Sequence, residues 1–459
     1  MTSVDAVSEQ HALTEHVWPR NARLHDGEFV LAGVSATQLA DEHGTPAFFL
    51  DESDFRERAQ LFRDAFRAAF SPLGVDVDVY YAGKAFLSIA VARWAHEEGL
   101  RIDTASMGEM AVALRAGIPG DHMGLHGNNK SDEERRRAIT HRVGRIVIDS
   151  PGEIDDIVRV ARALGRTAAD PVPVMVRVTT GIHAGGHDFI ATAREDQKFG
   201  LSLAGGQALA TLTAVLDHPE LHLLGAHAHI GSQIQDPTAF EVNARKMLTL
   251  RADLEHATGY LMPELDLGGG YGIAYTPEET PIDVPNLAQR LATTLSEVAA
   301  ELGTTIPRIS IEPGRSIIGP AMVTCYRVGV VKPVVTDEGV TRLYVSVDGG
   351  MSDNIRPALY GAQYTARLAN RTGSEQGALA RVVGKHCESG DIIIPDVVLP
   401  ADIGPGDLLV VAATGAYNRS MASNYNNLLK PPVIAVREGH TTVLVRRETE
   451  DDLLATDLG

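Results

Sequence analysis

A lysine, a glycine run, a carboxylate and an imidazole occur in this chain at positions where they could act together in catalysis. Lys84 stands in the segment YAGKAF, directly after the apolar run VDVYYA. A lysine amine that is partly desolvated and close to other cations loses basicity and can form a Schiff base with an aldehyde. A solvated surface lysine is the commoner alternative. The motifs that accompany Lys84 therefore decide between the two.

Two further motifs offer groups for an anion and for a ring nitrogen. DLGGGYG, residues 266–272, places consecutive glycines after a strand-like run, and their amides could approach a phosphate or simply form a tight turn. EPGRS, residues 312–316, sets Glu312 and Arg315 on a Pro-Gly turn. A carboxylate there can keep a pyridine nitrogen protonated and a guanidinium can grip a carboxylate, or the two can form a surface ion pair.

HAHIGSQ, residues 227–233, adds the imidazole of His229 and the hydroxyl of Ser232. A single histidine is most often a packed core residue, so His229 is a candidate site residue only because the other motifs accompany it. An amine, a phosphate-binding loop, a carboxylate and an imidazole together match the needs of pyridoxal 5'-phosphate, whose ring accepts electrons when a bond at Cα breaks. The sequence therefore predicts a pyridoxal phosphate site.

These motifs fall at strand ends in a repeating β-α pattern. Short β-branched or aromatic runs begin near residues 75, 99, 121, 145, 172, 221, 263 and 308, with amphipathic helical segments between them. Eight alternations over about 240 residues predict a (β/α)8 TIM barrel, whereas an open doubly wound sheet usually has fewer strands. The strand ends of a barrel meet at one mouth, and the polar residues expected there are Lys84, Asp103, His126, Asn128, Asp149, Arg177, His229, Gly268–Gly270, Glu312 and Arg315.

The remainder of the chain predicts a second, all-β domain of sandwich or barrel-like form. No helical pattern follows the eighth strand, and β-type alternation continues to the end of the chain. We expect an N-terminal segment, 1–46, that joins the β domain, an α/β barrel over 47–317, and the β domain over 318–459. The helical segment that precedes the first barrel strand, DESDFRERAQLFRDAFRAAF, could supply the missing eighth helix.

Composition limits the partners of this chain. Its formal net charge of −19 argues against nucleic acid or an anionic membrane as the main partner. The only cysteines, Cys325 and Cys387, provide no disulfide framework and favour a reducing cytoplasm. The N-terminus lacks the apolar core of a signal peptide, and no apolar run is long enough to span a membrane. We therefore expect a soluble cytoplasmic protein.

Seven motifs together resemble those of the diaminopimelate decarboxylase family, which belongs to the barrel-type (alanine racemase-like) pyridoxal phosphate decarboxylases. They occur in the family's order and are YAGKA, HIGSQI, DLGGGYG, EPGRS, VDGGMSDNIRPALY, GKHCESGDII and ATGAYNRSMASNYN. The resemblance extends from near residue 22 to near residue 450. It implies decarboxylation of meso-2,6-diaminopimelate to L-lysine and carbon dioxide, the last step of lysine biosynthesis, by a homodimer with shared active sites.

The resemblance also implies roles for individual residues. Lys84 would carry the cofactor as an internal aldimine, and His229 would stack on its ring. The other cofactor-binding residues would be Ser232, Gly269, Gly270, Glu312, Gly314, Arg315 and Tyr417. The substrate would be bound by Arg315, Arg356, Tyr360, Glu388 and Tyr417. Cys387 and Glu388 would come from the other subunit, with Cys387 as the proton donor.

Residue types alone do not single out several of these side chains. By default Arg356 would be a solvated loop residue, Tyr417 a packed aromatic, and Cys387 a small buried residue. A decarboxylase of the same fold that acts on ornithine, arginine or lysine is the nearest alternative, but it would need an acidic group where Arg356 offers a cation. A non-catalytic relative that binds the cofactor is a second alternative. A racemase is a third, and it would need an additional acid/base on the opposite ring face.

Two features depart from the commoner family pattern. The first strand end has Gly83 and Phe86 where many relatives carry a bulkier residue and an asparagine. The loop 181–200 is glycine-rich where relatives usually carry a His-Thr-His stretch. His183 and His187 lie four residues apart, a metal-binding spacing on a helix, but the surrounding glycines argue against a helix and we predict no metal.

Overall fold

A computed structural model describes residues 13–182 and 198–459 of the chain. The chain divides into two compact units. The barrel unit comprises Arg58–Gly272 and Ile282–Gly314, and the β unit comprises Met1–Glu57, Ile273–Pro281 and Arg315–Gly459.

The barrel unit contains a closed ring of eight parallel strands, which confirms the predicted TIM barrel. Neighbouring strands pair in chain order, and the last strand pairs with the first, so the ring has no open edge. The strands are β5 (Val77–Ala82), β6 (Arg101–Thr104), β7 (Met123–Leu125), β8 (Arg145–Ile148), β9 (Val172–Thr179), β11 (Leu221–Ala228), β12 (Glu264–Asp266) and β13 (Arg308–Ile311). A two-residue strand, β10 (Leu201–Ser202), is added to β9.

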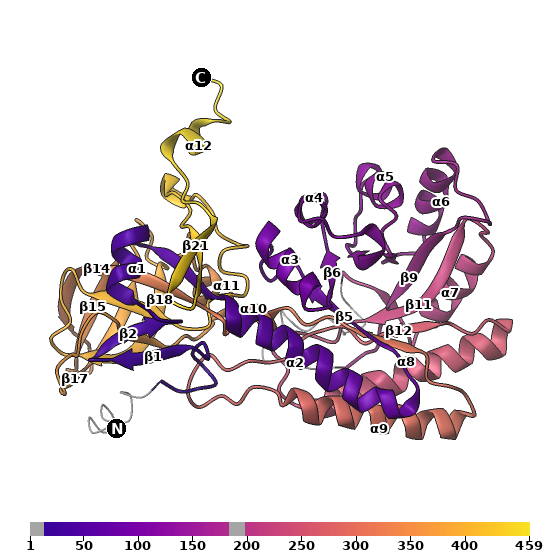
Figure 1. Ribbon diagram of the computed structural model, residues 1–459, viewed down its shortest axis with the longest axis horizontal. Helices are drawn as coiled ribbons and strands as arrows, with labels where there is room; N and C mark the ends of the chain where they lie inside the picture. Colours follow the sequence, from indigo (N-terminus) through magenta and orange to yellow (C-terminus); the bar gives the residue numbers. More distant parts are fainter. Residues whose placement is uncertain (1–12, 183–197) are drawn as a thin grey trace. The chain divides into compact units, whose positions relative to one another are not determined.

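Helices lie outside the ring of strands (Figure 1). They are α2 (Glu52–Phe70), α3 (Ile89–Glu97), α4 (Met107–Arg115), α5 (Asp132–Thr140), α6 (Glu153–Ala163), α7 (Gln207–Leu216), α8 (Pro237–Thr258) and α9 (Val284–Leu302). Their ends carry the expected signals: Ser131 and Glu134 form a capping box at α5, and α9 ends at Gly303 in the left-handed conformation. The apolar stripe of α9, which includes Leu287, Leu291 and Leu295, is buried.

α2 precedes the first barrel strand and supplies the eighth helix that the sequence predicts. The ring of Phe62 packs against that of Tyr271, with 5.1 Å between the ring centroids. Gln60 donates a 2.7 Å hydrogen bond to Glu98, which follows α3. The three phenylalanines Phe62, Phe66 and Phe70 are all buried, so one face of α2 packs into the unit.

The β unit is built mainly from sheet, as predicted. Its nine-stranded sheet follows the order β18-β17-β15-β14-β4-β20-β21, with β16 paired to β19 and β19 to β14. The strands are β4 (Ala47–Asp51), β14 (Met322–Val335), β15 (Thr341–Val347), β16 (Ala366–Leu368), β17 (Gly377–Val383), β18 (Ile392–Pro400), β19 (Leu408–Val411), β20 (Val433–Arg437) and β21 (His440–Val445). A three-stranded sheet contains β1 (Ala22–His25), β2 (Glu28–Leu31) and β3 (Val34–Ser35).

Short helices are the main feature that the sequence analysis did not predict. After β13 the chain forms the four-residue helix α10 (Arg315–Ile318), where no helix was expected. The β unit also contains α1 (Ala36–His43), α11 (Arg356–Tyr360) and α12 (Glu450–Leu454). Helices of one or two turns are too short to show a helical period in the sequence. None of the helices in the described parts of the chain is both long and apolar enough to cross a bilayer.

Candidate active site

Lys84 lies just beyond the carboxyl end of β5, and its side chain is exposed. The preceding Gly83 packs closely against the neighbouring strand in this chain, since a Cβ there would lie 2.8 Å from the carbonyl oxygen of Asp103. Its amide donates a 3.0 Å hydrogen bond to that same oxygen. Ser88 then caps α3 by accepting a bond from the amide of Val91. The turn between strand and helix therefore presents the amine at the barrel mouth.

The glycine loop after β12 adjoins two other predicted segments of the site. The Gly269 amide donates a 3.3 Å hydrogen bond to Nδ1 of His229. A Cβ on Gly269 would lie 2.2 Å from the carbonyl oxygen of Glu312, so a larger residue does not fit between β12 and β13. Close packing, which the sequence analysis did not consider, thus accounts for Gly269. The loop brings His229 and Glu312 together at the mouth.

The Glu312 carboxylate is held by two imidazoles. Nε2 of His126 lies 3.2 Å from Oε1, and Nε2 of His227 lies 3.2 Å from Oε2. Burial by itself would raise the pKa of Glu312, but His227 and His126 outweigh burial and keep this pKa well below its usual range. Glu312 is therefore an ionised acceptor. Oε1 also lies 3.3 Å from Nη2 of Arg145, whereas Oε2 has a further lone pair with which it can accept another hydrogen bond.

The three histidines around Glu312 differ in charge. Burial by itself would lower the pKa of His126, but Glu312 and Asp103 outweigh it and raise the pKa to about 9. Burial lowers the pKa of His227 to about 4 despite the adjacent Glu312. Burial, helped by the Lys84 ammonium and by Arg177, also holds the pKa of His229 well below its usual value. His126 is thus an imidazolium near neutral pH, whereas His229 is a neutral ring suited to stacking.

A second polar layer lies in the barrel interior, and the sequence analysis missed it. Arg145, at the start of β8, has no exposed side-chain surface and contacts carboxylates on two other strands, β6 and β12. Its partners include Asp266, at 2.6 Å, and Glu264, at 3.2 Å. A signal was available, because Glu264 and Asp266 are two residues apart in a buried strand and must face the same side. The sequence analysis considered only the residues that follow each strand, so it overlooked Glu264 and Asp266.

The histidines and Glu312 also raise the question of a metal. One ligand atom from each of His126, His227 and Glu312 lies within 4.8 Å of the others. The Arg145 guanidinium already lies 3.3 Å from Oε1 of Glu312, and a protonated His126 cannot ligate a cation. The cluster is therefore better described as a hydrogen-bonded charge network. His183 and His187, for which we predicted no metal, lie outside the described residues.

The β unit contains a separate cluster of two buried arginines and three tyrosines. Arg315 donates a hydrogen bond to the hydroxyl of Tyr275, and its guanidinium carbon lies 4.7 Å from the ring centroid of Tyr417. Arg356 donates a 2.6 Å hydrogen bond to Tyr364. Arg356 is only 6% exposed, so the default expectation of a solvated loop arginine is wrong. A buried guanidinium such as that of Arg356, which donates to a neutral tyrosine hydroxyl, suits the recognition of an anion.

Two tyrosines predicted to bind the substrate, Tyr417 and Tyr360, differ in backbone conformation and in side-chain contacts. Tyr417 adopts a φ of 70°, a left-handed conformation that is uncommon for a residue with a side chain and is found disproportionately at functional sites. Tyr360 ends α11 and is half-buried, and it takes no part in the described contacts of the arginine–tyrosine cluster.

Cys387 and Glu388 lie on the loop between β17 and β18. The thiol of Cys387 is exposed, so the default expectation of a buried cysteine is wrong. The loop is anchored by His386, whose Nε2 lies 2.8 Å from Oγ of Ser352. Glu388 accepts a 3.2 Å bond from the Gly390 amide. A well-anchored loop therefore presents the thiol to the surface.

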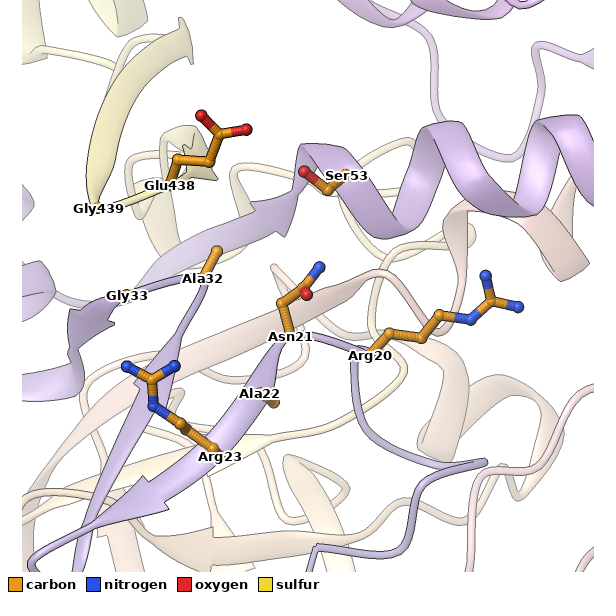
Figure 2. Close-up of a pocket in the computed structure, with 9 residues that line it drawn as sticks. All are labelled: Arg20, Asn21, Ala22, Arg23, Ala32, Gly33, Ser53, Glu438 and Gly439. Carbon is orange, nitrogen blue, oxygen red and sulfur yellow. The ribbon is translucent and has the colours of Figure 1, made fainter.

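A cavity of about 530 Å³ in the β unit is unrelated to the predicted residues (Figure 2). It is lined by Arg20, Asn21, Ala22, Arg23, Ala32, Gly33, Ser53, Glu438 and Gly439. Arg20 is already paired with Glu57, at 3.1 Å, and with Asp54, at 3.5 Å. Figure 2 shows its guanidinium pointing away from that of Arg23. The cavity thus lacks a convergent set of polar groups.

Comparison with known proteins identifies the family. Residues 52–319 match the model of the pyridoxal binding domain of pyridoxal-dependent decarboxylases. The chain is 47% identical to a diaminopimelate decarboxylase of Corynebacterium efficiens, over 99% of this chain and 96% of the relative. The chain belongs to the diaminopimelate decarboxylase family. A family member of Bacillus subtilis is 43% identical over 94% of this chain and 95% of the relative.

Solved structures of the family agree with this assignment. The structure of diaminopimelate decarboxylase from M. jannaschii in complex with L-lysine has a TM-score of 0.87 and 28% identity, covering 96% of this chain and 98% of that one. The enzyme from Helicobacter pylori complexed with L-lysine has a TM-score of 0.81 at 28% identity, covering 91% of this chain and 98% of the other.

The residues at the barrel mouth fit the family's cofactor, pyridoxal 5'-phosphate. Its pyridine nitrogen requires an ionised carboxylate when protonated, and Glu312 is held in that state. Its aldehyde requires a primary amine, which Lys84 offers at the end of β5. A neutral imidazole such as His229 can stack on a protonated ring without charge repulsion. The side chains in this unit therefore fit the ring nitrogen, the aldehyde and one ring face of the cofactor.

Proposed function

We propose that the protein decarboxylates meso-2,6-diaminopimelate to L-lysine and carbon dioxide with pyridoxal 5'-phosphate, as the last step of lysine biosynthesis. The observation that carries the proposal is the ionised Glu312, which is ion-paired with His126 and hydrogen-bonded to His227, beside His229, the glycine loop and the strand end that carries Lys84. Bound pyridoxal phosphate would supply an electron-accepting ring for the electrons of the broken Cα–carboxylate bond. Every other task falls to the side chains of the chain itself.

Lys84 would hold the cofactor through its amine and release it when the substrate amine arrives. Glu312 would keep the ring nitrogen protonated because its carboxylate remains ionised. His229 would cover one ring face and leave the other face to the substrate. Ser232, Gly269, Gly270, Gly314 and the backbone around Arg315 would bind the phosphate, together with Tyr417.

The arginine–tyrosine cluster supports a substrate with two carboxylates. Arg356 would receive the distal carboxylate in bidentate fashion, with Arg315, Tyr360 and Tyr417 at the remaining polar groups. Ornithine and lysine have no distal carboxylate, so a buried guanidinium would disfavour them, and an acidic group would be required instead. This charge argument favours diaminopimelate over the substrates of the related decarboxylases.

We further propose that the enzyme acts as a cytoplasmic homodimer. Cys387 and Glu388 would enter the active site of the partner subunit, where the Cys387 thiol would return a proton to Cα and Glu388 would contact the substrate amine. The exposure of Cys387 on an anchored loop supports this role, because a residue that serves another subunit must project from its own.

Incubation of the purified protein with meso-diaminopimelate, ornithine, lysine and arginine in separate reactions tests the substrate. We expect lysine and carbon dioxide from the first reaction and negligible amine from the others. Release of a diamine from ornithine or lysine, with none of the first product, would replace the proposal with the related activity. A Lys84→Ala variant is expected to lose the absorbance of covalently held cofactor and at least about a thousandfold in kcat.

A further inference from the structure

The fully buried Arg145 is the largest charged group in the interior of the barrel. Interiors of such barrels are normally filled by branched apolar side chains, so a guanidinium there requires an explanation. Its carbon lies 3.5 Å from the ring centroid of Tyr80, on β5. The neighbouring strand leaves room for it: a Cβ on Gly124 would lie 3.2 Å from Nε of Arg145 and 2.4 Å from Oδ1 of Asp103.

The two ends of the guanidinium contact different groups. Nη1 donates to Oγ of Ser310 at 2.9 Å and lies 3.2 Å from Oε1 of Glu264, deeper in the barrel. Nη2 lies 2.6 Å from Oδ2 of Asp266. The same nitrogen lies 3.4 Å from Asp103 and 3.3 Å from Oε1 of Glu312. One end of Arg145 is thus anchored in the core, and the other end reaches the carboxylates around the proposed cofactor site.

Stability alone does not account for this arrangement. A buried ion pair contributes little net stability, because desolvation offsets most of the attraction, and apolar substitutes of similar volume are often equally stable. Four carboxyl groups surround the one guanidinium, those of Asp103, Glu264, Asp266 and Glu312. Without Arg145 these groups would repel one another, and the carboxylates at the mouth would turn away or take up protons.

We propose that Arg145 is a positioning residue that fixes the Glu312 carboxylate for the pyridine nitrogen of the cofactor. This inference rests on the proposed function, because it assigns Arg145 to the group that would contact the ring. Arg145 itself touches neither cofactor nor substrate. It acts by holding Oε1 of Glu312 from below, while His227 holds Oε2. Ser310 accepts a hydrogen bond from Arg145 and also donates to Asp266 at 2.9 Å, and it thereby fixes the position of the guanidinium.

Titration of cofactor-free protein with pyridoxal phosphate, followed by absorbance of the bound cofactor, tests the proposal in Arg145→Met, Arg145→Lys and Glu264→Gln. We expect Arg145→Met to raise the dissociation constant of pyridoxal phosphate by about tenfold or more and to shift the absorbance of the bound form. Arg145→Lys keeps the positive charge but lacks the planar guanidinium with its several donors. Its increase in the dissociation constant should therefore be intermediate. Glu264→Gln disturbs the same network without contacting Glu312 and should stay within about threefold of wild type.

A folded Arg145→Met variant with the wild-type dissociation constant and spectrum would overturn the proposal. So would a loss in Glu264→Gln equal to that in Arg145→Met, since it would indicate general disruption of the core. Circular dichroism and thermal unfolding establish that each variant is folded. If Arg145→Met does not fold, Arg145→Lys decides, and wild-type cofactor binding in it overturns the proposal. Failure of wild-type protein to bind the cofactor would instead remove the proposed function.

Discussion

The Arg356 guanidinium donates a 2.6 Å hydrogen bond to the hydroxyl of Tyr364. That hydroxyl in turn donates to Oδ1 of Asn418 at 3.1 Å, so the arginine is held at the end of a buried chain of donors. Its carbon also lies 4.9 Å from the ring centroid of Tyr275. A guanidinium has five N–H donors, and the bond to Tyr364 uses one of them. The orientation of Arg356 is therefore fixed before any carboxylate binds.

The first prediction concerns this orientation. Tyr364→Phe removes the hydroxyl that holds Arg356 and should raise KM for diaminopimelate about tenfold, with a smaller effect on kcat, since a hydrogen bond to a charged group contributes about 1.5–3 kcal/mol. Arg356→Met should raise KM further and reduce the preference for diaminopimelate over lysine. Steady-state kinetics on both substrates measure these changes.

Arg327→Met provides the matched control for these variants. Arg327 is an exposed arginine on β14 in the same unit, so its replacement should leave KM unchanged. An Arg356→Met variant with unchanged KM and unchanged substrate preference would exclude Arg356 from recognition of the distal carboxylate.

The second prediction concerns Glu312. An amide cannot keep the pyridine nitrogen protonated, so Glu312→Gln should lower kcat by about a hundredfold or more while KM changes little. Glu297→Gln, an exposed substitution on α9, is the control and should be silent. Near-normal turnover in Glu312→Gln would show that the ring nitrogen obtains its proton elsewhere.

Sequence patterns located the strand ends well because a parallel barrel brings them together by topology alone. Lys84, His229 and Glu312 follow their strands directly, so position in the repeat sufficed to group them. Arg145 and Glu264 begin their strands, and their meeting depends on the register across the closed ring. A period-2 reading of PELDL and RIVID would have marked these residues as inward-facing, but it would not have shown that they touch each other.

The β unit was harder to derive for a different reason. Arg315 and Arg356 are 41 residues apart in the chain (356 minus 315), and both contact Tyr275, from a third segment. No local pattern relates such segments, so residue types alone favoured a solvated Arg356. The family resemblance named Arg315 and Arg356, and the structure adds Tyr275, Tyr364 and Asn418.

The third prediction concerns pH and stability. The pKa of His126 is raised to about 9 in the folded protein, above the unfolded value near 6.5. Its contribution to the free energy of unfolding is therefore complete below about pH 6.5 and is lost as the pH rises through 9, with an upper limit of about 3 kcal/mol. The raised pKa of Asp266, about 8, acts in the same direction.

Urea unfolding of cofactor-free wild type and His126→Gln at pH 6 and pH 9.5 measures this effect. Wild type should lose more stability than the variant between these two pH values, because the variant lacks the ionisable ring but retains Asp266. Equal losses in the two proteins would mean that His126 is not protonated in the folded state.

The last prediction concerns assembly and uses two inactive variants. If Cys387 serves the active site of the partner subunit, a dimer of Lys84→Ala with Cys387→Ala contains one site with both defects and one site with neither. Equal amounts of the two variants, exchanged to random dimers, should then recover about a quarter of wild-type activity. If each subunit used its own Cys387, every site in the mixture would remain defective and no activity would return.

An equal mixture of Cys325→Ala with Lys84→Ala provides the control. Cys325 is buried in its own subunit, so the Cys325→Ala chain should behave like wild type, and the mixture should show half of wild-type activity because half of its sites contain Lys84. Recovery of activity therefore distinguishes a shared site from an independent one without requiring a structure of the dimer.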